Sequence, residues 1–153
     1  MEPPQPESAP VAPVRVPPST LKSVERRPVD AAPELFTRAN AARRGGELAR
    51  AKSLYSELIA RYPASEEARL SEISLGKLLL ASGEPAQAER EFRRYLSAGG
   101  APLAEEALVS QAESFRAMSR TSDERKAWQR LLAQHPESVY AARARTRLAA
   151  LGP

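Results

Sequence analysis

The chain has 153 residues, enough for one domain and a tail, and 27% of them are charged while only 5% are aromatic. Its formal net charge is +4, and because its basic residues are interleaved with acidic ones, we interpret the excess mainly as a solvated helix surface. The absence of cysteine excludes disulfides and thiolate chemistry, and no apolar run approaches the ~20 residues that a membrane span requires.

Residues 1–31 form a proline-rich segment, which we predict to be a disordered tail or linker. Nine of the 14 prolines of the chain lie at or before Pro33. Proline fixes φ and removes backbone donors, so this stretch favours extended and PPII conformations. Its few apolar side chains do not offset the entropy of ordering the backbone. As an alternative, residues 3–6 or 13–18 would serve as a PPII ligand for an aromatic groove.

The N-terminal sequence indicates no export signal. It contains no basic cluster followed by an apolar stretch, which is the pattern of a signal peptide. We therefore expect a cytoplasmic location for the chain as written, and a periplasmic or cell-envelope location if it is a fragment or starts further upstream.

The sequence predicts a helical repeat domain over residues 32–153. Apolar residues recur at helical spacing in three pairs of segments. Gly45-Gly46, Ser82-Gly83 and Ser119–Ser122 separate segments where tight turns are needed. The predicted helices are, in chain order, Glu34–Arg43 and Leu48–Arg61, Glu66–Ala81 and Pro85–Leu96, Leu103–Met118 and Asp123–Ala133, and a single last helix Val139–Ala150.

Small polar residues and glycine mark several of these helix ends. Ser65 and Ser138 each follow a proline by two residues and suit helix N-caps. Thr121–Glu124 has the sequence of a capping box, which would open the second helix of the third pair. Gly152 ends the last helix in the usual C-terminal manner.

The second helices of the three pairs are copies of one pattern, with small, aromatic, aliphatic and closing residues at offsets of 4, 7 and 12. Successive copies lie 37 and 36 residues apart, and self-similarity at such a period is typical of a helical solenoid. Offsets of 4 and 7 share one helix face, so we expect the aromatic ring to fill the gap between neighbouring pairs. The copies are Ala51, Tyr55, Leu58 and Pro63; Ala88, Phe92, Tyr95 and Gly100; and Glu124, Trp128, Leu131 and Pro136.

The unpaired last helix is expected to cap this stack, because no pair buries its apolar face alone. Arg143, Arg145 and Arg147 would keep its outer side in water. The copies depart from the pattern at two places: Gly100 replaces a closing proline, and Glu124 replaces the small alanine.

The segment Gly46–Pro63 resembles the second half of a tetratricopeptide repeat. Leu75-Gly76, followed by Gly83, Ala88 and Phe92, resembles the series that spans both helices of such a repeat. The resemblance implies an all-α fold, a right-handed solenoid of three helical hairpins plus a C-terminal capping helix. It also implies a non-catalytic scaffold that binds a segment of another protein in its concave groove.

The turns Tyr62–Ser65 and His135–Ser138 are similar to those of bacterial cell-envelope members of this family. These include the Tol-Pal system coordinator and the outer-membrane assembly lipoproteins. The resemblance, which covers about residues 32–150, therefore implies a role in the cell envelope.

The first helices of such repeats line the groove, so the resemblance also implies its residues. Basic side chains mixed with one aromatic ring suit an extended or helical partner segment that bears carboxylates. Asn40 coincides with the asparagine of the two-carboxylate clamp of chaperone-binding members. Phe36 and Ser74 do not reproduce the basic partners of that clamp, which disfavours a chaperone C-terminus. By repeat register, the predicted groove residues are Phe36, Asn40, Arg43, Ser74, Lys77, Ser110, Glu113 and Arg116.

The residues predict no catalysis, metal or cofactor. His135 is the sole histidine, so ordinary zinc ligand sets and a Ser-His-Asp arrangement lack partners. It stands where the first repeat has Tyr62, and we interpret it as a packing or capping residue. Glu66-Glu67 and Glu105-Glu106 lie in first helical turns, where they complement the helix dipole.

Three alternatives stay open from the sequence. Similar domains follow a proline-rich spacer in membrane-associated anti-sigma or FecR-like transcriptional regulators, so this chain would be a sensor domain. Arg43-Arg44, Arg93-Arg94 and the arginines of the last helix would bind nucleic acid weakly, although aromatic platforms for bases are missing. We expect a monomer without a small-molecule substrate, with self-association through an uncapped first repeat as the third alternative.

Overall fold

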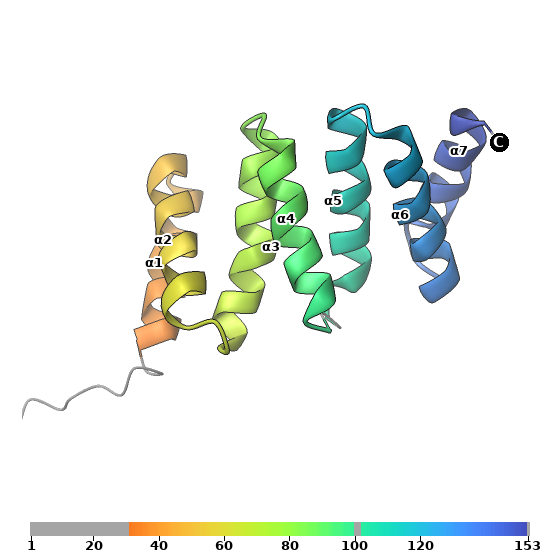
Figure 1. Cartoon of the computed structure of the whole chain (residues 1–153). Coiled ribbons are helices and arrows are strands. Elements are labelled where there is room, and N and C mark those ends of the chain that lie inside the picture. The colour runs from red at the N-terminus through yellow and green to blue at the C-terminus, as the bar shows by residue number, and fades with distance from the viewer. Residues whose placement is uncertain (1–30, 100–101, 153) are drawn as a thin grey trace, which may run out of the picture.

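The computed structural model describes residues 31–99 and 102–152, which form seven α-helices and no strand (Figure 1). The helix pairs follow one another in a row from α1–α2 to α7 (Figure 1). None of these helices is long and apolar enough to cross a membrane. They are α1 (Ala31–Arg44), α2 (Leu48–Arg61), α3 (Glu66–Ala81), α4 (Pro85–Ser97), α5 (Ala104–Ala117), α6 (Thr121–Gln134) and α7 (Ala141–Leu151).

The helix limits agree closely with those that the sequence predicts. The bounds of α2 and α3 are identical, and the others differ by one to three residues. The largest shift is at α1, which begins at Ala31 because Pro33 stands in its first turn, where its missing N–H has no helical partner to lose. Residues 1–30 of the predicted tail and the closing position Gly100 lie outside the described residues, whereas Ala31, which was assigned to the tail, is the first residue of α1.

The pairs α1–α2, α3–α4 and α5–α6 stack into a solenoid with two unequal layers. Each helix packs against the next along the chain, and in addition α1 touches α3 and α3 touches α5. The second helices α2, α4 and α6 do not pack against one another. The first helices therefore form the closer-spaced inner layer, and the second helices form the outer one.

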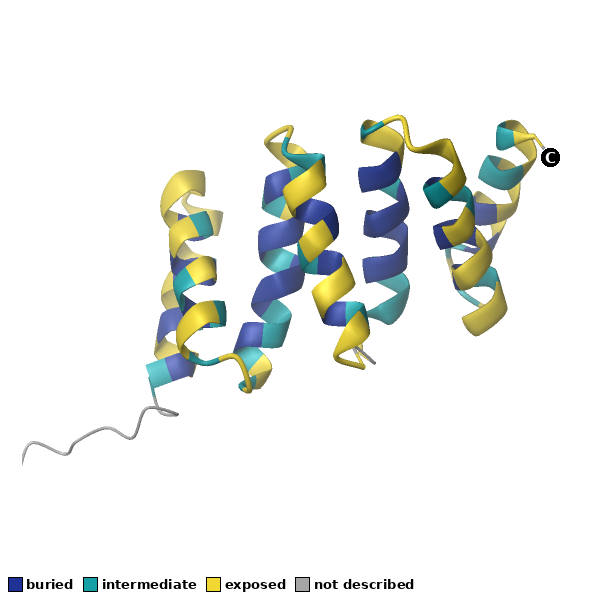
Figure 2. Ribbon diagram, in the orientation of Figure 1, coloured by how far each residue is buried: buried dark blue, intermediate teal, exposed yellow. Residues whose placement is uncertain are grey.

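Buried residues line the helix faces inside the stack (Figure 2). The aromatic residues of the repeat are interior, as predicted, but Tyr55 and Phe92 pack on the first helix of their own pair, whereas we expected the rings to fill the gap between pairs. Tyr55 and Phe92 are fully buried and Trp128 is 2% exposed. Phe92 lies directly on Gly76 of α3, where an added Cβ would come within 2.6 Å of its ring. Glycine at this position lets α3 and α4 approach closely, which explains the Leu75-Gly76 pair of the sequence pattern.

Two of the predicted helix caps are wrong and two are confirmed. The Ser65 hydroxyl accepts a hydrogen bond from Ala68 N–H at 3.0 Å, and Gly152 ends α7 at a φ of 72°. Ser138 is not the N-cap of α7, because the helix begins only at Ala141; its hydroxyl donates to Glu105 at 2.6 Å and accepts from Tyr140 N–H at 3.1 Å, in the turn before the helix.

The capping box at Thr121–Glu124 does not form. Thr121 is already the first helical residue, and the N-cap position falls to Arg120 without a side-chain hydrogen bond. Glu124 turns inward instead of back to the helix start, because Trp128 and Arg147 offer it a donor each.

The last helix packs differently from the prediction. Arg145 is exposed, whereas Arg143 and Arg147 reach from α7 to carboxylates of α5 and α6. Residues 143 and 147 are four apart and share one helix face, while residue 145 points away from it. Two of the three arginines therefore face the neighbouring helices, and the third faces solvent.

Candidate partner-binding groove

A cavity of 340 Å³ opens on the inner layer between α1, α3 and the start of α5. Four of the predicted groove residues meet here: Phe36 and Arg43 from α1, and Ser74 and Lys77 from α3. The other lining residues are Leu70, Ile73, Leu78, Leu103 and Glu106.

The cavity has an apolar floor and a charged rim. Phe36 is half-buried against Tyr55, with the ring centroids 6.3 Å apart, so the floor belongs to the packed core. Lys77 on α3 forms an ion pair of 2.9 Å with Glu106 on α5. Arg43 is exposed and forms no ion pair within residues 31–99 and 102–152. Its guanidinium is therefore available to a carboxylate.

Asn40 and Ser110 lie on the same helices but outside this cavity. The Asn40 side-chain oxygen accepts a hydrogen bond of 2.8 Å from the Tyr55 hydroxyl, so part of this amide is already engaged. Ser110 is only 6% exposed, and its carbonyl accepts from the Ser114 hydroxyl. Both offer a partner little free hydrogen-bonding surface.

Glu113 and Arg116 line a second cavity of 380 Å³ between α5, α6 and α7. Trp128 lies in its wall, with the Arg143 guanidinium 5.5 Å from the centroid of the indole. Arg143 also pairs with Glu113, which ties α7 to α5. The eight predicted residues thus divide between two cavities along the inner layer and two positions turned toward neighbouring helices.

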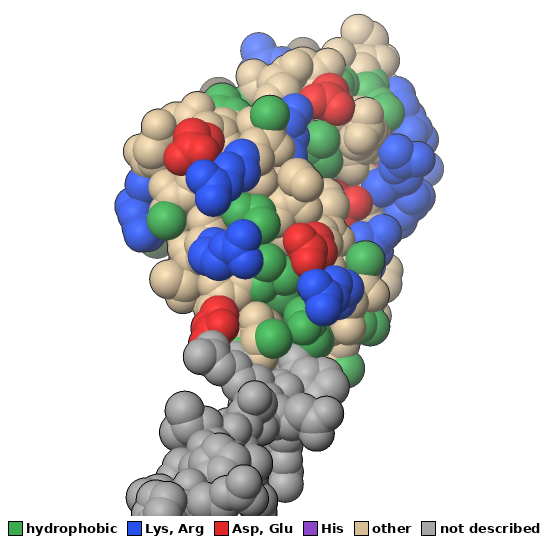
Figure 3. Space-filling view, turned by 90° about the vertical axis from the view of Figure 1, so that its left-hand side faces the viewer, with side chains coloured by type: hydrophobic (Ala, Val, Ile, Leu, Met, Phe, Trp, Pro, Cys, Tyr) green, Lys and Arg blue, Asp and Glu red, His purple; other side chains and the backbone are tan. Residues whose placement is uncertain are grey.

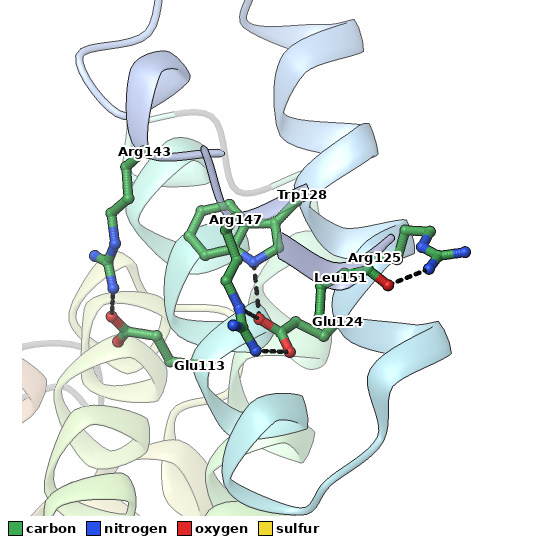
Figure 4. Close-up of polar contacts among 7 residues, drawn as sticks. All are labelled: Glu113, Glu124, Arg125, Trp128, Arg143, Arg147 and Leu151. Carbon is green, nitrogen blue, oxygen red and sulfur yellow. Dashed lines mark hydrogen bonds and ion pairs between the residues drawn. The ribbon is translucent and has the colours of Figure 1, made fainter. Parts of the chain in front are cut away.

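Glu124 is the buried anion beside this second cavity. Both of its oxygens accept from Arg147, at 2.6 and 3.0 Å, and Trp128 Nε1 donates at 3.2 Å (Figure 4). The hydrogen bond from Arg147 holds the pKa of the Glu124 carboxyl below its usual value, although burial opposes the shift. A bidentate pair of this kind fixes α7 against α6.

The sequence reasoning missed the residues that complete both cavities. Glu106 was interpreted through the helix dipole, whereas it pairs with Lys77 across the inner layer. Arg143, Thr146 and Arg147 contribute one face of α7, and their i, i+3, i+4 spacing was the available signal. His135 is the C-cap residue of α6, with its ring 3.7 Å from Glu105.

Charges on the end of the solenoid formed by α1 and α2 are mixed. Figure 3 shows Lys and Arg side chains on this face separated by acidic and apolar ones. Within the described part of the chain, no group of three or more His, Cys, Asp or Glu side chains is placed to hold a metal ion.

An α-solenoid with an inner layer of first helices and an outer layer of second helices is the architecture of helical-repeat proteins. Residues 35–65 and 106–138, which correspond to the first and third helix pairs, match the family model of the tetratricopeptide repeat. The third pair is matched in spite of Glu124 at the position of the small residue. No curated protein sequence matches this chain.

Solved structures show the same fold at low sequence identity. The TPR domain of Arabidopsis OM64 has a TM-score of 0.66 and 18% identity over 80% of this chain and 97% of that chain. The second TPR domain of human RPAP3, in complex with the HSP70 peptide SGPTIEEVD, has a TM-score of 0.67 and 17% identity over 83% and 99%. MamA 41-end from Desulfovibrio magneticus RS-1 has a TM-score of 0.64 and 15% identity over 78% of this chain and 63% of that chain. The all-α solenoid of tetratricopeptide type is thereby established.

Proposed function

We propose that this chain is a non-catalytic scaffold that binds a segment of another protein across the inner layer, at the cavity between α1 and α3. The observation that carries the proposal is the combination of an apolar floor with one exposed arginine that has no ion pair within the described residues. Phe36, Ile73 and Leu78 line the floor, and Arg43 stands exposed at the edge.

The chemistry of the cavity defines the partner segment. An apolar side chain would fill the 340 Å³ space and displace water from its floor, which provides most of the affinity. A carboxylate next to this anchor would pair with the Arg43 guanidinium. We therefore propose a segment with a large apolar residue flanked by Asp or Glu.

A structural neighbour supports the proposal. The RPAP3 domain, which has the same fold, is in complex with a peptide whose letters IEEVD combine two apolar residues with three acidic ones. The fold is thus able to hold such a segment. The anchoring residues proposed here are those of this chain, because Asn40 is engaged with Tyr55 and Ser74 is no cation.

Selection of a displayed random-peptide library on the full chain tests the proposal. We expect enrichment of peptides that carry Leu, Ile or Phe next to Asp or Glu. The affinity of the selected peptides should fall at least about tenfold in Arg43→Glu, because an attractive pair becomes a repulsive one.

Arg44→Glu is the matched control, since Arg44 is the next residue of α1, is exposed and does not line the cavity. It should keep most of the affinity. Equal losses in the two variants would indicate only a long-range charge effect, and unchanged binding in Arg43→Glu would refute the assigned groove.

A further inference from the structure

The outer layer carries a cavity larger than those of the inner layer. It measures 570 Å³ and lies between α2 and α4, which do not touch, with α3 as its floor. On the α2 side it is lined by Ser56 and by three apolar residues, Ile59, Ala60 and Pro63, and Leu75 adds an apolar residue from the floor. Exposed residues such as Ala60 and Ala98 form its rim, so it opens to solvent.

A buried carboxyl with an unsatisfied oxygen lines this cavity. Glu72 on α3 is 7% exposed, and its Oε2 is buried without a hydrogen-bond partner in the described structure. Its other oxygen is 3.9 Å from Arg94 Nε, at the outer limit of an ion pair. A buried acceptor without a donor costs free energy, so a group that supplies the donor would be bound favourably.

The other charged groups around Glu72 leave this oxygen free. Arg94 on α4 makes its short contact, 2.7 Å, with Glu91 on the same helix. Arg69 lines the cavity from α3, and no titratable residue of α2 does so. The Arg94 guanidinium is therefore close to the carboxylate of Glu91 and distant from that of Glu72.

Comparison with the other buried glutamates shows that an empty acceptor is unusual in this chain. Glu124 is bound by Arg147 and Trp128, and Glu89 accepts a hydrogen bond of 3.1 Å from Gln111. Arg147 and Gln111 lie on helices that pack against the helix of the glutamate, and Trp128 lies on the same helix as Glu124. At Glu72 the corresponding donor is missing, and an open cavity stands beside it.

We propose that this outer cavity is a second docking site, which takes a lysine side chain of a partner protein with its ammonium on Glu72 Oε2. The apolar walls would contact the four methylene groups of the lysine, and the charged head would reach the buried oxygen below the rim. Lysine fits better than arginine, because an ammonium is a point charge with three donors, whereas a planar guanidinium needs two free oxygens side by side.

The experiment uses amide NMR of the full chain and two small probes, Nα-acetyl-L-lysine methylamide and its Nε-acetylated counterpart, which has no charge. At about pH 8, where the carboxyl is ionised, the charged probe should shift the amide signals of Ala60, Leu75 and Ala98 with saturation. The acetylated probe should produce no saturable shift. Equal responses to both probes would overturn the proposal.

Substitutions separate the docking site from general surface charge. Glu72→Gln should abolish the response to the charged probe. Glu57→Gln is the matched control, because Glu57 lies on α2 outside the cavity and pairs with Arg61. If cavity amides shift on Glu72→Gln while the probe has no effect on the unaltered chain, the chain's own cations occupy the site and the proposal is wrong.

The pH dependence gives a second readout. Burial raises the pKa of the Glu72 carboxyl to about 7. Because the ammonium binds the ionised form, affinity should rise about tenfold from about pH 6 to about pH 8. A flat profile would show that the ammonium is not bound by this carboxyl, and would overturn the proposal.

Discussion

Two buried glutamates, Glu124 at the C-terminal end and Glu72 in the middle of the solenoid, have opposite environments. Glu124 is held by two hydrogen bonds from Arg147 and one from Trp128, and its pKa is lowered. Glu72 has only a long ion pair with Arg94, 3.9 Å, its Oε2 has no hydrogen-bond partner in the described structure, and burial raises its pKa to about 7. The two residues are similarly inaccessible, at 2% and 7% exposure.

The difference shows that burial alone does not determine what a charged residue does in this fold. At Glu124 the carboxylate joins two helices, because α7 supplies a guanidinium on the facing side. At Glu72 the facing side is a cavity rather than a helix, so the same residue type costs stability in the isolated chain. The first site is a structural joint, and the second is suited to binding.

The largest expected change in stability is at Glu124, which joins α6 to α7. Glu124→Ala restores the alanine of the other two repeats, but it leaves the Trp128 N–H buried without a partner and breaks the contact of α6 with α7. We expect a loss of about 3 kcal/mol in the free energy of unfolding, measured by urea denaturation.

Glu113→Ala is the control for this loss, since its partner Arg143 is half exposed. The control should cost less than about 1 kcal/mol. If Glu124→Ala lowers the free energy of unfolding no more than Glu113→Ala does, the pair of Glu124 with Arg147 contributes no more than a surface ion pair. The contrast drawn between Glu124 and Glu72 would then be wrong.

A smaller effect of opposite sign is expected at Glu72. Its carboxyl has a pKa of about 7 in the folded chain against an ordinary 4.5, so the folded state binds the proton more tightly. The stability of the folded state therefore falls as pH rises from about 4.5 to about 7, and the loss is complete above it. Glu72→Gln has no proton to lose, so its stability relative to the unaltered chain should increase by about 2 kcal/mol between about pH 5 and about pH 8.

Chemical denaturation at several pH values measures this difference. Glu57→Gln, which removes an exposed carboxylate paired with Arg61, should show no comparable change with pH. A difference between Glu72→Gln and the unaltered chain that is independent of pH would mean that Glu72 is solvated in the folded state.

The repeat pattern predicted the layers and the buried aromatic residues but not these two sites. Offsets within one helix identified Tyr55, Phe92 and Trp128 as interior residues, because a buried helix face is a local property of the sequence. The partnership of Glu124 with Arg147 joins residues 23 positions apart on different helices, and it follows from the approach of α6 and α7 rather than from either segment. The predicted capping box at Thr121–Glu124 was wrong for the same reason.

The sequence predicted which helices carry the proposed groove residues, but not which of those side chains point into the cavity. Phe36, Arg43 and Lys77 meet in one cavity, whereas Asn40 and Ser110 turn toward neighbouring helices. One residue along a helix corresponds to a rotation of about 100°, and each first helix contacts neighbours on several sides. Repeat register alone therefore separates exposed from engaged positions poorly.

Glu89 provides the smallest and sharpest test, because it lies between the two extremes. It is 6% exposed and accepts one hydrogen bond from Gln111, while Arg93 approaches only to 3.7 Å. Gln111→Leu would remove the donor and make Glu89 resemble Glu72. We expect a loss of about 1 kcal/mol in the free energy of unfolding, the usual contribution of one buried hydrogen bond.

The matched control is Gln87→Leu, which removes an exposed amide that donates to Glu84 at 2.8 Å and should change stability little. The double variant Glu89→Leu/Gln111→Leu should recover most of the loss, because removing both partners leaves no unsatisfied group. If the double variant is less stable than Gln111→Leu, then Glu89 stabilises the fold through Arg93 or through packing. In that case a buried glutamate of this solenoid would not need a donor from a facing helix, and the contrast between Glu124 and Glu72 would have another cause.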